Sequence, residues 1–265
     1  GLDPGALNSV SYPTGAGNTG NGTSSGPIVR DAYGAITSLE WRKPDGTTLT
    51  KNAVDFVNPA DGAPKILLIH DYNNHGEDNA DVAAIGADLK DLYGAANVTI
   101  TEPMSVVRPD DLTGFDVVWF SNPGWPMGNV SSLPTTFNTL LDFRGAGGGL
   151  ILQGDDITQS STPTLPLMET LTYMKFSNNG TNACGLGIDN WGDNAYDVTF
   201  GSTGHPLLSG LAGKSFKYNN DIDHSSAMML GEQVLATGSV ASGNCSVSTP
   251  ALVAIDPLAI TSTIP

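Results

Sequence analysis

Two adjacent carboxylates, Asp155 and Asp156, follow an apolar run at residues 150–152 in the stretch GGGLILQGDD. A continuous apolar run is typical of a buried parallel strand, and ligands of open α/β sheets bind beyond the carboxyl ends of such strands. The two carboxylates could hold a hard cation such as calcium, which takes several oxygen ligands, or act as an acid and a base. Alternatively, one of them caps the following helix by accepting backbone N–H bonds.

A second polar loop, residues 70–81, reads HDYNNHGEDNAD and follows the apolar run KILLI. Its start matches the spacing of an EF-hand calcium loop, but position twelve carries valine instead of the bidentate glutamate that such a loop requires. The loop is therefore not an EF-hand. Asp71 is expected to lie close to Asp155 and Asp156 in the sheet, and these three carboxylates form the candidate calcium site. His70 is expected to line a pocket beside them.

Two segments in the second half of the chain also carry side chains that could do chemistry. Residues 189–197 (DNWGDNAYD) hold oxygen-bearing side chains, which suit either a calcium loop or an ordinary solvated loop. Trp191 in this segment and Trp125 in NPGWPMG could stack on a sugar face, although buried tryptophans also simply pack. His224 in NNDIDH could act as a general base, but no serine or cysteine in a matching turn accompanies it.

The net charge excludes one class of partner. The chain has 265 residues, with 11 Lys and Arg against 27 Asp and Glu, a formal net charge of -16. An acidic surface repels phosphate backbones, so nucleic acid is not an expected partner. Cations are the expected counterparts of this charge. Many glycines and few lysines are typical of an exported protein, and we expect an extracellular or cell-surface location. No apolar run approaches the roughly 18 residues that cross a membrane.

The two cysteines, Cys184 and Cys245, are expected to form a disulfide in that setting. Such a bond would close a long loop and stabilise the fold by roughly 3 to 4 kcal/mol. The alternative is two unrelated buried thiols, since cysteine is often a small core residue. Triplets that permit N-glycosylation stand at Asn21, Asn97, Asn129, Asn179 and Asn244.

The elements that must position these residues follow from apolar periodicity. Apolar runs predict strands, and apolar residues at helical spacing between them predict helices. Their alternation predicts a doubly wound, mostly parallel α/β sheet with right-handed crossovers. The expected strands are residues 65–72, 97–102, 115–121, 149–153, 196–200, 234–236 and 251–255, and the expected helices are residues 79–93, 133–143 and 165–174.

The residues before this domain form an extension. Residues 1–27 are rich in Gly, Asn, Ser and Thr, so they cannot offset the entropy of ordering by burial among themselves and are expected to be a flexible or partner-docked arm. Residues 28–63 are expected to hold a β-hairpin and a connector, because Pro-Asp-Gly separates two β-prone runs within residues 34–50. Residues 64–265 form the α/β domain. His205 precedes a proline and is expected to mark a turn.

Four motifs, in the order KILLIHD, DVVWFSNPGWP, GGGLILQGDD and GHPLLSGL, resemble the class I glutamine amidotransferase-like superfamily and, more narrowly, its trehalose-utilisation-like relatives. The likeness covers residues 64–255. It implies a flavodoxin-like sheet with a sharp turn after the fourth strand, where catalytic members hold a cysteine nucleophile. Here residues 153–156 (QGDD) occupy that turn without a cysteine, and Cys184 lies about 30 residues further on. The amidotransferase mechanism is therefore not carried over.

These observations predict a non-catalytic module that binds or self-assembles in an extracellular structure. Residues 1–60 are expected to dock by strand addition on another copy of the chain or on another extracellular protein. The residues expected to bind a ligand are His70, Ser121, Trp125, Gln153 and Trp191.

Two other functions fit the same residues. A carbohydrate-active hydrolase would pair Asp155 or Asp156 with Asp71 or Asp223, at a separation of about 5 Å or about 6.5 to 9.5 Å across a cleft. A receptor for a glycan or small ligand would require its tryptophans, Trp125 and Trp191, to line an open groove.

Overall fold

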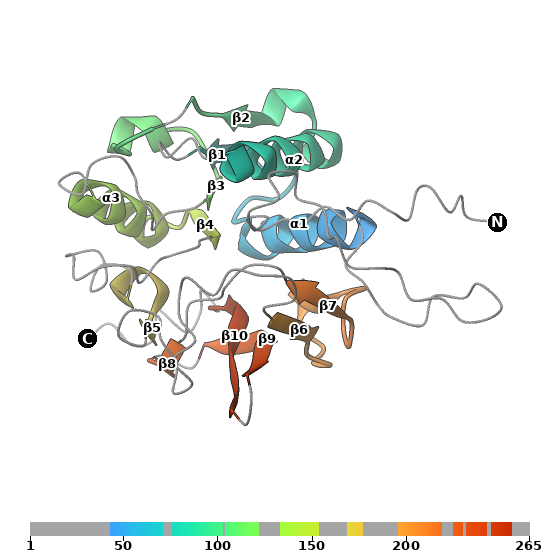
Figure 1. Ribbon diagram of the computed structural model, residues 1–265. Coiled ribbons are helices and arrows are strands. Elements are labelled where there is room, and N and C mark those ends of the chain that lie inside the picture. Colours follow the sequence, from blue (N-terminus) through green and yellow to red (C-terminus); the bar gives the residue numbers. More distant parts are fainter. Residues whose placement is uncertain are drawn as a thin grey trace, which may run out of the picture.

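A parallel sheet and an antiparallel sheet lie on opposite sides of one helix, α1, in the computed structural model of the chain (Figure 1). A third sheet of two strands lies beside the antiparallel one (Figure 1). The structure describes residues 43–70, 76–102, 104–121, 133–153, 169–176, 196–218, 225–229, 232–242 and 245–255.

The parallel sheet is built from the four apolar runs in the first half of the domain. Its strands lie in the order β2-β1-β3-β4, and every neighbouring pair is parallel. This confirms the prediction of an α/β fold with a flavodoxin-like parallel sheet. The strands are β1 (Ile66–Ile69), β2 (Val98–Ile100), β3 (Val117–Ser121) and β4 (Gly149–Gln153).

Two helices cover opposite faces of this sheet, because side chains alternate along each strand. Ile66 and Leu68 of β1 pack in the cluster that includes α2, whereas Leu67 and Ile69 pack in the cluster that includes α3. Both helices were predicted from their apolar spacing. They are α2 (Gly76–Tyr93), which connects β1 to β2, and α3 (Leu133–Gly145), which connects β3 to β4.

The strands predicted in the second half of the chain exist, but they form a separate antiparallel sheet in the order β10-β9-β6-β7. The reason lies in the connections: only two residues separate β9 from β10, and a parallel crossover needs a dozen or more. Residues 169–172 are helical, so the helix expected at 165–174 ends earlier and Met174 begins a strand. The bounds are β5 (Met174–Phe176), β6 (Tyr196–Phe200), β7 (Ser215–Tyr218), β8 (Ser225–Met228), β9 (Gln233–Ser242) and β10 (Cys245–Ala254), with β5 pairing β8.

The β-hairpin predicted within residues 34–50 is wrong where the structure describes it. Helix α1 (Lys43–Val57) contains the expected turn and the whole second strand; the first strand lies outside the described residues. Pro44 in the first turn of a helix is favourable because its fixed φ suits a helix and its missing N–H is not needed there. Asp45 adds a carboxylate at the positive end of the helix dipole. The Pro-Asp-Gly sequence therefore begins a helix instead of closing a hairpin.

Both sides of α1 are buried against the rest of the chain. Val54 is fully buried in the core of the parallel sheet, while Leu49 and Phe56 pack on the core of the antiparallel sheet. Asp45 forms an ion pair with Lys214, which directly precedes β7. Because α1 is a helix, it offers no strand for addition to a partner, and the expectation that residues 1–60 dock on a partner stays a prediction.

Two glycines fit the elements together. Gly94 has φ 87 and ends α2 as predicted, with its N–H donating to the Lys90 carbonyl at 2.9 Å. Gly149 begins β4 directly under the end of α1, where a Cβ atom would lie 2.4 Å from the Val57 carbonyl oxygen. The first position of β4 therefore requires the absence of a side chain.

The close approach of α1 to β4 predicts the effect of one methyl group. Gly149→Ala is expected to lower the free energy of unfolding by about 1 to 3 kcal/mol, because backbone must move to admit the Cβ atom. The matched control is Gly145→Ala at the end of α3, where nothing lies within 4 Å of the added atom and alanine favours the helix. Denaturant unfolding of both variants measures the difference, and equal stabilities would contradict the packing.

A pair of threonines on α1 gives a second prediction. The hydroxyl of Thr50 is buried and has no hydrogen-bond partner in the part of the chain that the structure describes, whereas Thr47 Oγ1 donates to Asp88 Oδ2 at 3.0 Å. Thr50→Val is expected to raise the free energy of unfolding by about 1 kcal/mol, and Thr47→Val to lower it by about 1 kcal/mol. Helix propensity cancels because both changes keep a β-branched side chain. A loss of stability in Thr50→Val would contradict this.

Candidate functional site

The strand order of the parallel sheet selects one place for a site. The chain leaves β1 through α2 on one face and leaves β3 through α3 on the other. Neighbouring strands whose connections run to opposite faces leave a crevice at their carboxyl ends, and in the order 2-1-3-4 this switch point lies between β1 and β3. The candidate site is therefore the carboxyl edge of β1, β3 and β4.

Three residues predicted to bind a ligand meet at this edge. His70 directly follows β1, Ser121 ends β3 and Gln153 ends β4. The register pairs Ile69 with Phe120 and Ser121 with Gln153, so the three positions lie at the same level on successive strands, about 4.8 Å apart in the sheet. The sequence placed these residues correctly at the backbone level, and for Ser121 and Gln153 the structure describes only the backbone.

His70 is fixed by the segment that follows β2. Its exposed fraction is 9%. Its N–H donates to Thr101 Oγ1 at 3.0 Å, and its carbonyl accepts from the Met104 N–H at 3.0 Å. Thr101 and Met104 therefore hold the end of β1 in place, a role that the sequence analysis missed. The available signal was their position at the end of the expected strand 97–102, which contains Thr101 and stops two residues before Met104.

Apart from Asp197 and the backbone of Cys245, the remaining predicted site residues lie outside the described residues, so the calcium site, the carboxylate pair, the stacking tryptophans and the disulfide stay predictions. Asp197 is exposed in β6, where the strand register places it opposite Ser239 of β9 and Lys217 of β7. It therefore belongs to a strand. Within the described ranges, no group of three His, Cys, Asp or Glu side chains could hold a metal ion. Cys245 is described by its backbone alone. The predicted site residues that are not described are Asp71, Trp125, Asp155, Asp156, Cys184, Trp191, Asp223 and His224.

Comparison of the chain with models of protein families, with curated proteins and with solved structures finds no match in any of the three. The resemblance to amidotransferase-like proteins therefore stays an expectation from sequence motifs. None of the helices in the described ranges is long and apolar enough to cross a membrane.

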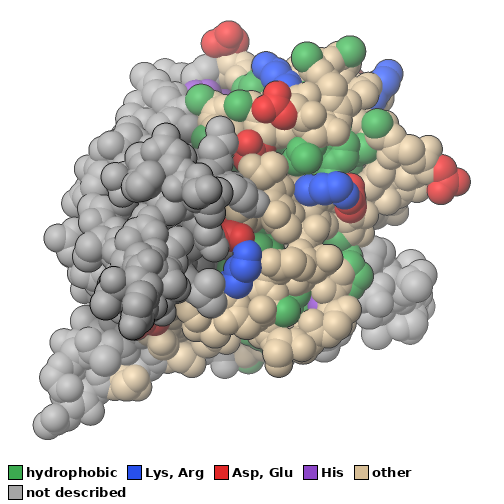
Figure 2. Space-filling model, turned by 90° about the vertical axis from the view of Figure 1, so that its right-hand side faces the viewer, with side chains coloured by type: hydrophobic (Ala, Val, Ile, Leu, Met, Phe, Trp, Pro, Cys, Tyr) green, Lys and Arg blue, Asp and Glu red, His purple; other side chains and the backbone are tan. Residues whose placement is uncertain are grey.

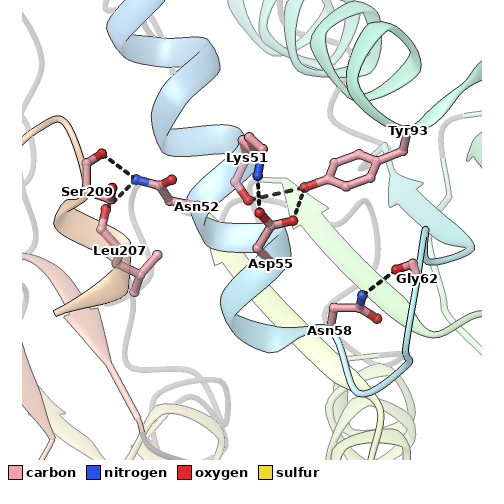
Figure 3. A network of polar contacts seen from close by, with 8 residues as sticks. All are labelled: Lys51, Asn52, Asp55, Asn58, Gly62, Tyr93, Leu207 and Ser209. Atoms are coloured by element: carbon pink, nitrogen blue, oxygen red, sulfur yellow. Dashed lines mark hydrogen bonds and ion pairs between the residues drawn. The ribbon is translucent and has the colours of Figure 1, made fainter.

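A polar network on α1 joins it to both of its neighbours (Figure 3). Asp55 pairs with Lys51 and accepts a hydrogen bond of 2.8 Å from the Tyr93 hydroxyl at the end of α2. On the other side of α1, the Asn52 amide donates to backbone carbonyls that precede β7. Burial raises the pKa of Tyr93 above its usual value, and the hydrogen bond and negative charge of Asp55 raise it further. This network holds helices together and is separate from the carboxyl edge.

Arg144 forms a second polar contact at the last turn of α3. Its guanidinium lies 4.8 Å from the centre of the Tyr173 ring and donates to the Tyr173 hydroxyl at 3.1 Å and to the Leu171 carbonyl. Burial lowers the pKa of Arg144, and the Tyr173 hydroxyl partly offsets this. Because α3 returns the chain from the carboxyl end of β3 to the start of β4, Arg144 lies at the opposite edge of the sheet from the site.

Charge is dispersed on the one face that the space-filling view presents. In the described part of Figure 2, acidic and basic side chains are interspersed and hydrophobic side chains form small separate groups. This pattern is that of an ordinary solvated face and gives no reason to move the candidate site away from the carboxyl edge.

The environment of Tyr93 predicts its ionisation. The pKa of Tyr93 in the folded chain lies above the unfolded value of about 10. The stability that the protonated hydroxyl contributes is therefore fully present below about pH 10 and is lost as the pH rises further. In an absorbance titration, the signal lost in Tyr93→Phe is expected to belong to a tyrosine that ionises well above pH 10. Circular dichroism at each pH separates ionisation in the folded chain from ionisation on unfolding. A Tyr93 signal centred near pH 10 in the folded chain would contradict the buried contact with Asp55.

Proposed function

We propose that the chain is a non-catalytic α/β module of an extracellular or cell-surface structure that binds a small ligand or glycan at the carboxyl edge of its parallel sheet. The observation that carries this proposal is the alignment of His70, Ser121 and Gln153 at the switch point. Crevices of this kind gather polar groups from several strands around one ligand. Self-assembly is the related use of the same module, through parts of the chain other than α1.

The sequence at the end of β4 supports a role without turnover. Residues 153–156 read Gln-Gly-Asp-Asp, without the cysteine nucleophile that catalytic members of the superfamily it resembles hold at this strand-to-helix turn. Amide and carboxylate groups suit binding, since they hydrogen-bond sugar hydroxyls and coordinate calcium. Calcium is the candidate cofactor, held by Asp71, Asp155 and Asp156.

The composition supports an extracellular location. An acidic chain with few lysines is poorly suited to nucleic acid, and the two cysteines provide for one disulfide in an oxidising compartment. These are properties of the sequence, and the location remains part of the proposal.

The hydrolase alternative is favoured by one feature of the sheet. β3 lies between β1 and β4, so the ends of β1 and β4 are about two strand spacings, roughly 10 Å, apart. Carboxylates placed just beyond these two ends would suit an inverting glycosidase, whose acid and base lie about 6.5 to 9.5 Å apart, better than a retaining one. Turnover of a glycoside that is lost in Asp155→Asn or Asp156→Asn would favour this alternative over a binding module.

Binding measurements on matched variants test the proposal. The chain is screened against a glycan array and titrated with calcium chloride. Each glycan signal is repeated with Ser121→Ala and Gln153→Ala, and the calcium signal is repeated with Asp155→Asn and Asp156→Asn. Each change is expected to weaken binding by about fivefold or more, the effect of one lost hydrogen bond. The control is Asn138→Ala on the exposed side of α3, which is expected to bind as the unchanged chain does.

Two outcomes would overturn this. One is the absence of binding to every glycan and to calcium. The other is glycan binding that Ser121→Ala and Gln153→Ala leave unchanged, since the glycan would then lie elsewhere on the molecule.

A further inference from the structure

His205 stands where α1 meets the turn that precedes β7. Its Nδ1 atom accepts a hydrogen bond of 3.2 Å from the Leu207 N–H, at the start of the turn η6 (Pro206–Leu208). The predicted turn at His205 is thus confirmed. On its other side, the ring lies 4.9 Å from the ring of Phe56 in α1, inclined by 56°. One half-buried imidazole therefore both caps the turn and packs against the helix between the two large sheets.

The residue that His205 caps is also the residue that α1 holds. The Leu207 carbonyl accepts a hydrogen bond of 3.0 Å from Asn52 Nδ2, which also donates to the Ser209 carbonyl at 2.9 Å (Figure 3). The Leu207 side chain is buried in the core of the antiparallel sheet, where it meets the apolar side of α1. A change in the hydrogen bond at His205 therefore acts directly on the contact between α1 and the second half of the chain.

This contact requires one protonation state of the ring. A neutral imidazole accepts through its unprotonated nitrogen, whereas an imidazolium has a donor at both nitrogens. Histidine is the side chain that changes charge between about pH 5 and 8. We propose that His205 is an acid-sensitive latch: protonation of Nδ1 breaks its bond with the Leu207 N–H and loosens the junction between α1 and the antiparallel sheet. This goes beyond the ligand binding proposed for the carboxyl edge.

The charged groups around the junction leave the ring without a counter-charge in the part of the chain that the structure describes. Asp45 of α1 is paired with Lys214 of the segment after η6. Lys51 and Asp55 of α1 are paired with each other and meet Tyr93 of α2, on the side away from Asn52 and η6 (Figure 3). No ion pair with a described carboxylate therefore compensates the proton on His205. The loss of the hydrogen bond to the Leu207 N–H thus makes protonation of His205 destabilise the junction.

Unfolding measurements at two pH values test the latch. Between about pH 8 and about pH 5, the unfolding equilibrium constant of the unchanged chain is expected to rise by about fivefold more than that of His205→Asn. Asparagine keeps a capping acceptor that acid does not protonate. His75→Asn and His224→Asn make the same change elsewhere in the chain and serve as controls, which are expected to keep the full acid response. An acid response in His205→Asn equal to that of the unchanged chain overturns the proposal.

A second measurement keeps the test independent of whether His205→Asn folds. Nuclear magnetic resonance of the unchanged chain follows the His205 ring nitrogens and the hydrogen exchange of the Leu207 amide, corrected for the intrinsic effect of pH. Protection of the Leu207 amide is expected to fall over the same pH range in which the ring gains its proton. Protection that stays constant while the ring titrates overturns the proposal.

Discussion

The fold depends on the burial of α1 against two cores at once. An ordinary amphipathic helix has one apolar stripe, but α1 presents Val54 to the parallel sheet and Leu49 and Phe56 to the antiparallel sheet. Two of its polar side chains, Asn52 and Asp45, bind the segment that precedes β7. Neither large sheet can therefore be described as folding on its own, because each uses one side of the same helix.

A second link joins the two halves on the α3 side of the parallel sheet. Leu171 is buried in the cluster that holds α3, and two residues later the Tyr173 carbonyl accepts a hydrogen bond from the Met229 N–H at 2.9 Å. β5 then pairs with β8, whose Ser225 N–H donates to Thr249 Oγ1 of β10 at 3.1 Å. The parallel sheet is thus connected to the second half through both of its faces, which keeps the carboxyl edge in a fixed relation to the rest of the molecule.

Local patterns in the sequence predicted the parallel sheet well. Its strands are continuous apolar runs and its helices have apolar residues at regular spacing, so each element is specified by its own residues, and Gly94 ends α2 where expected. The sequence Pro-Asp-Gly is ambiguous, because it suits both a hairpin turn and the first turn of a helix. Burial on two sides decided in favour of the helix, and that burial involves residues far along the chain. Asn52 and Leu207, for example, are 155 positions apart.

The same distinction applies to the candidate site. The positions of His70, Ser121 and Gln153 at one edge of the sheet were predicted from sequence, because each stands at the end of a predicted strand and parallel strands end at one edge. Thr101 and Met104, which hold His70, were missed because their role depends on how β2 pairs with β1. The separate antiparallel sheet was missed for a similar reason, since its strands were recognised but their partners were not.

The net negative charge of the chain and the hydrogen bond at His205 are expected to respond to acid in opposite ways. The chain has 11 Lys and Arg against 27 Asp and Glu, so its negative charge exceeds its positive charge and repels itself. Acid relieves this repulsion and so favours the folded state, whereas protonation of His205 opposes it. The two effects have opposite signs and overlap only at the acidic end of the range, because carboxylates gain protons at lower pH than histidine. Only a comparison that changes the capping atom and keeps the acidic residues can separate the local hydrogen bond from the field of the whole molecule.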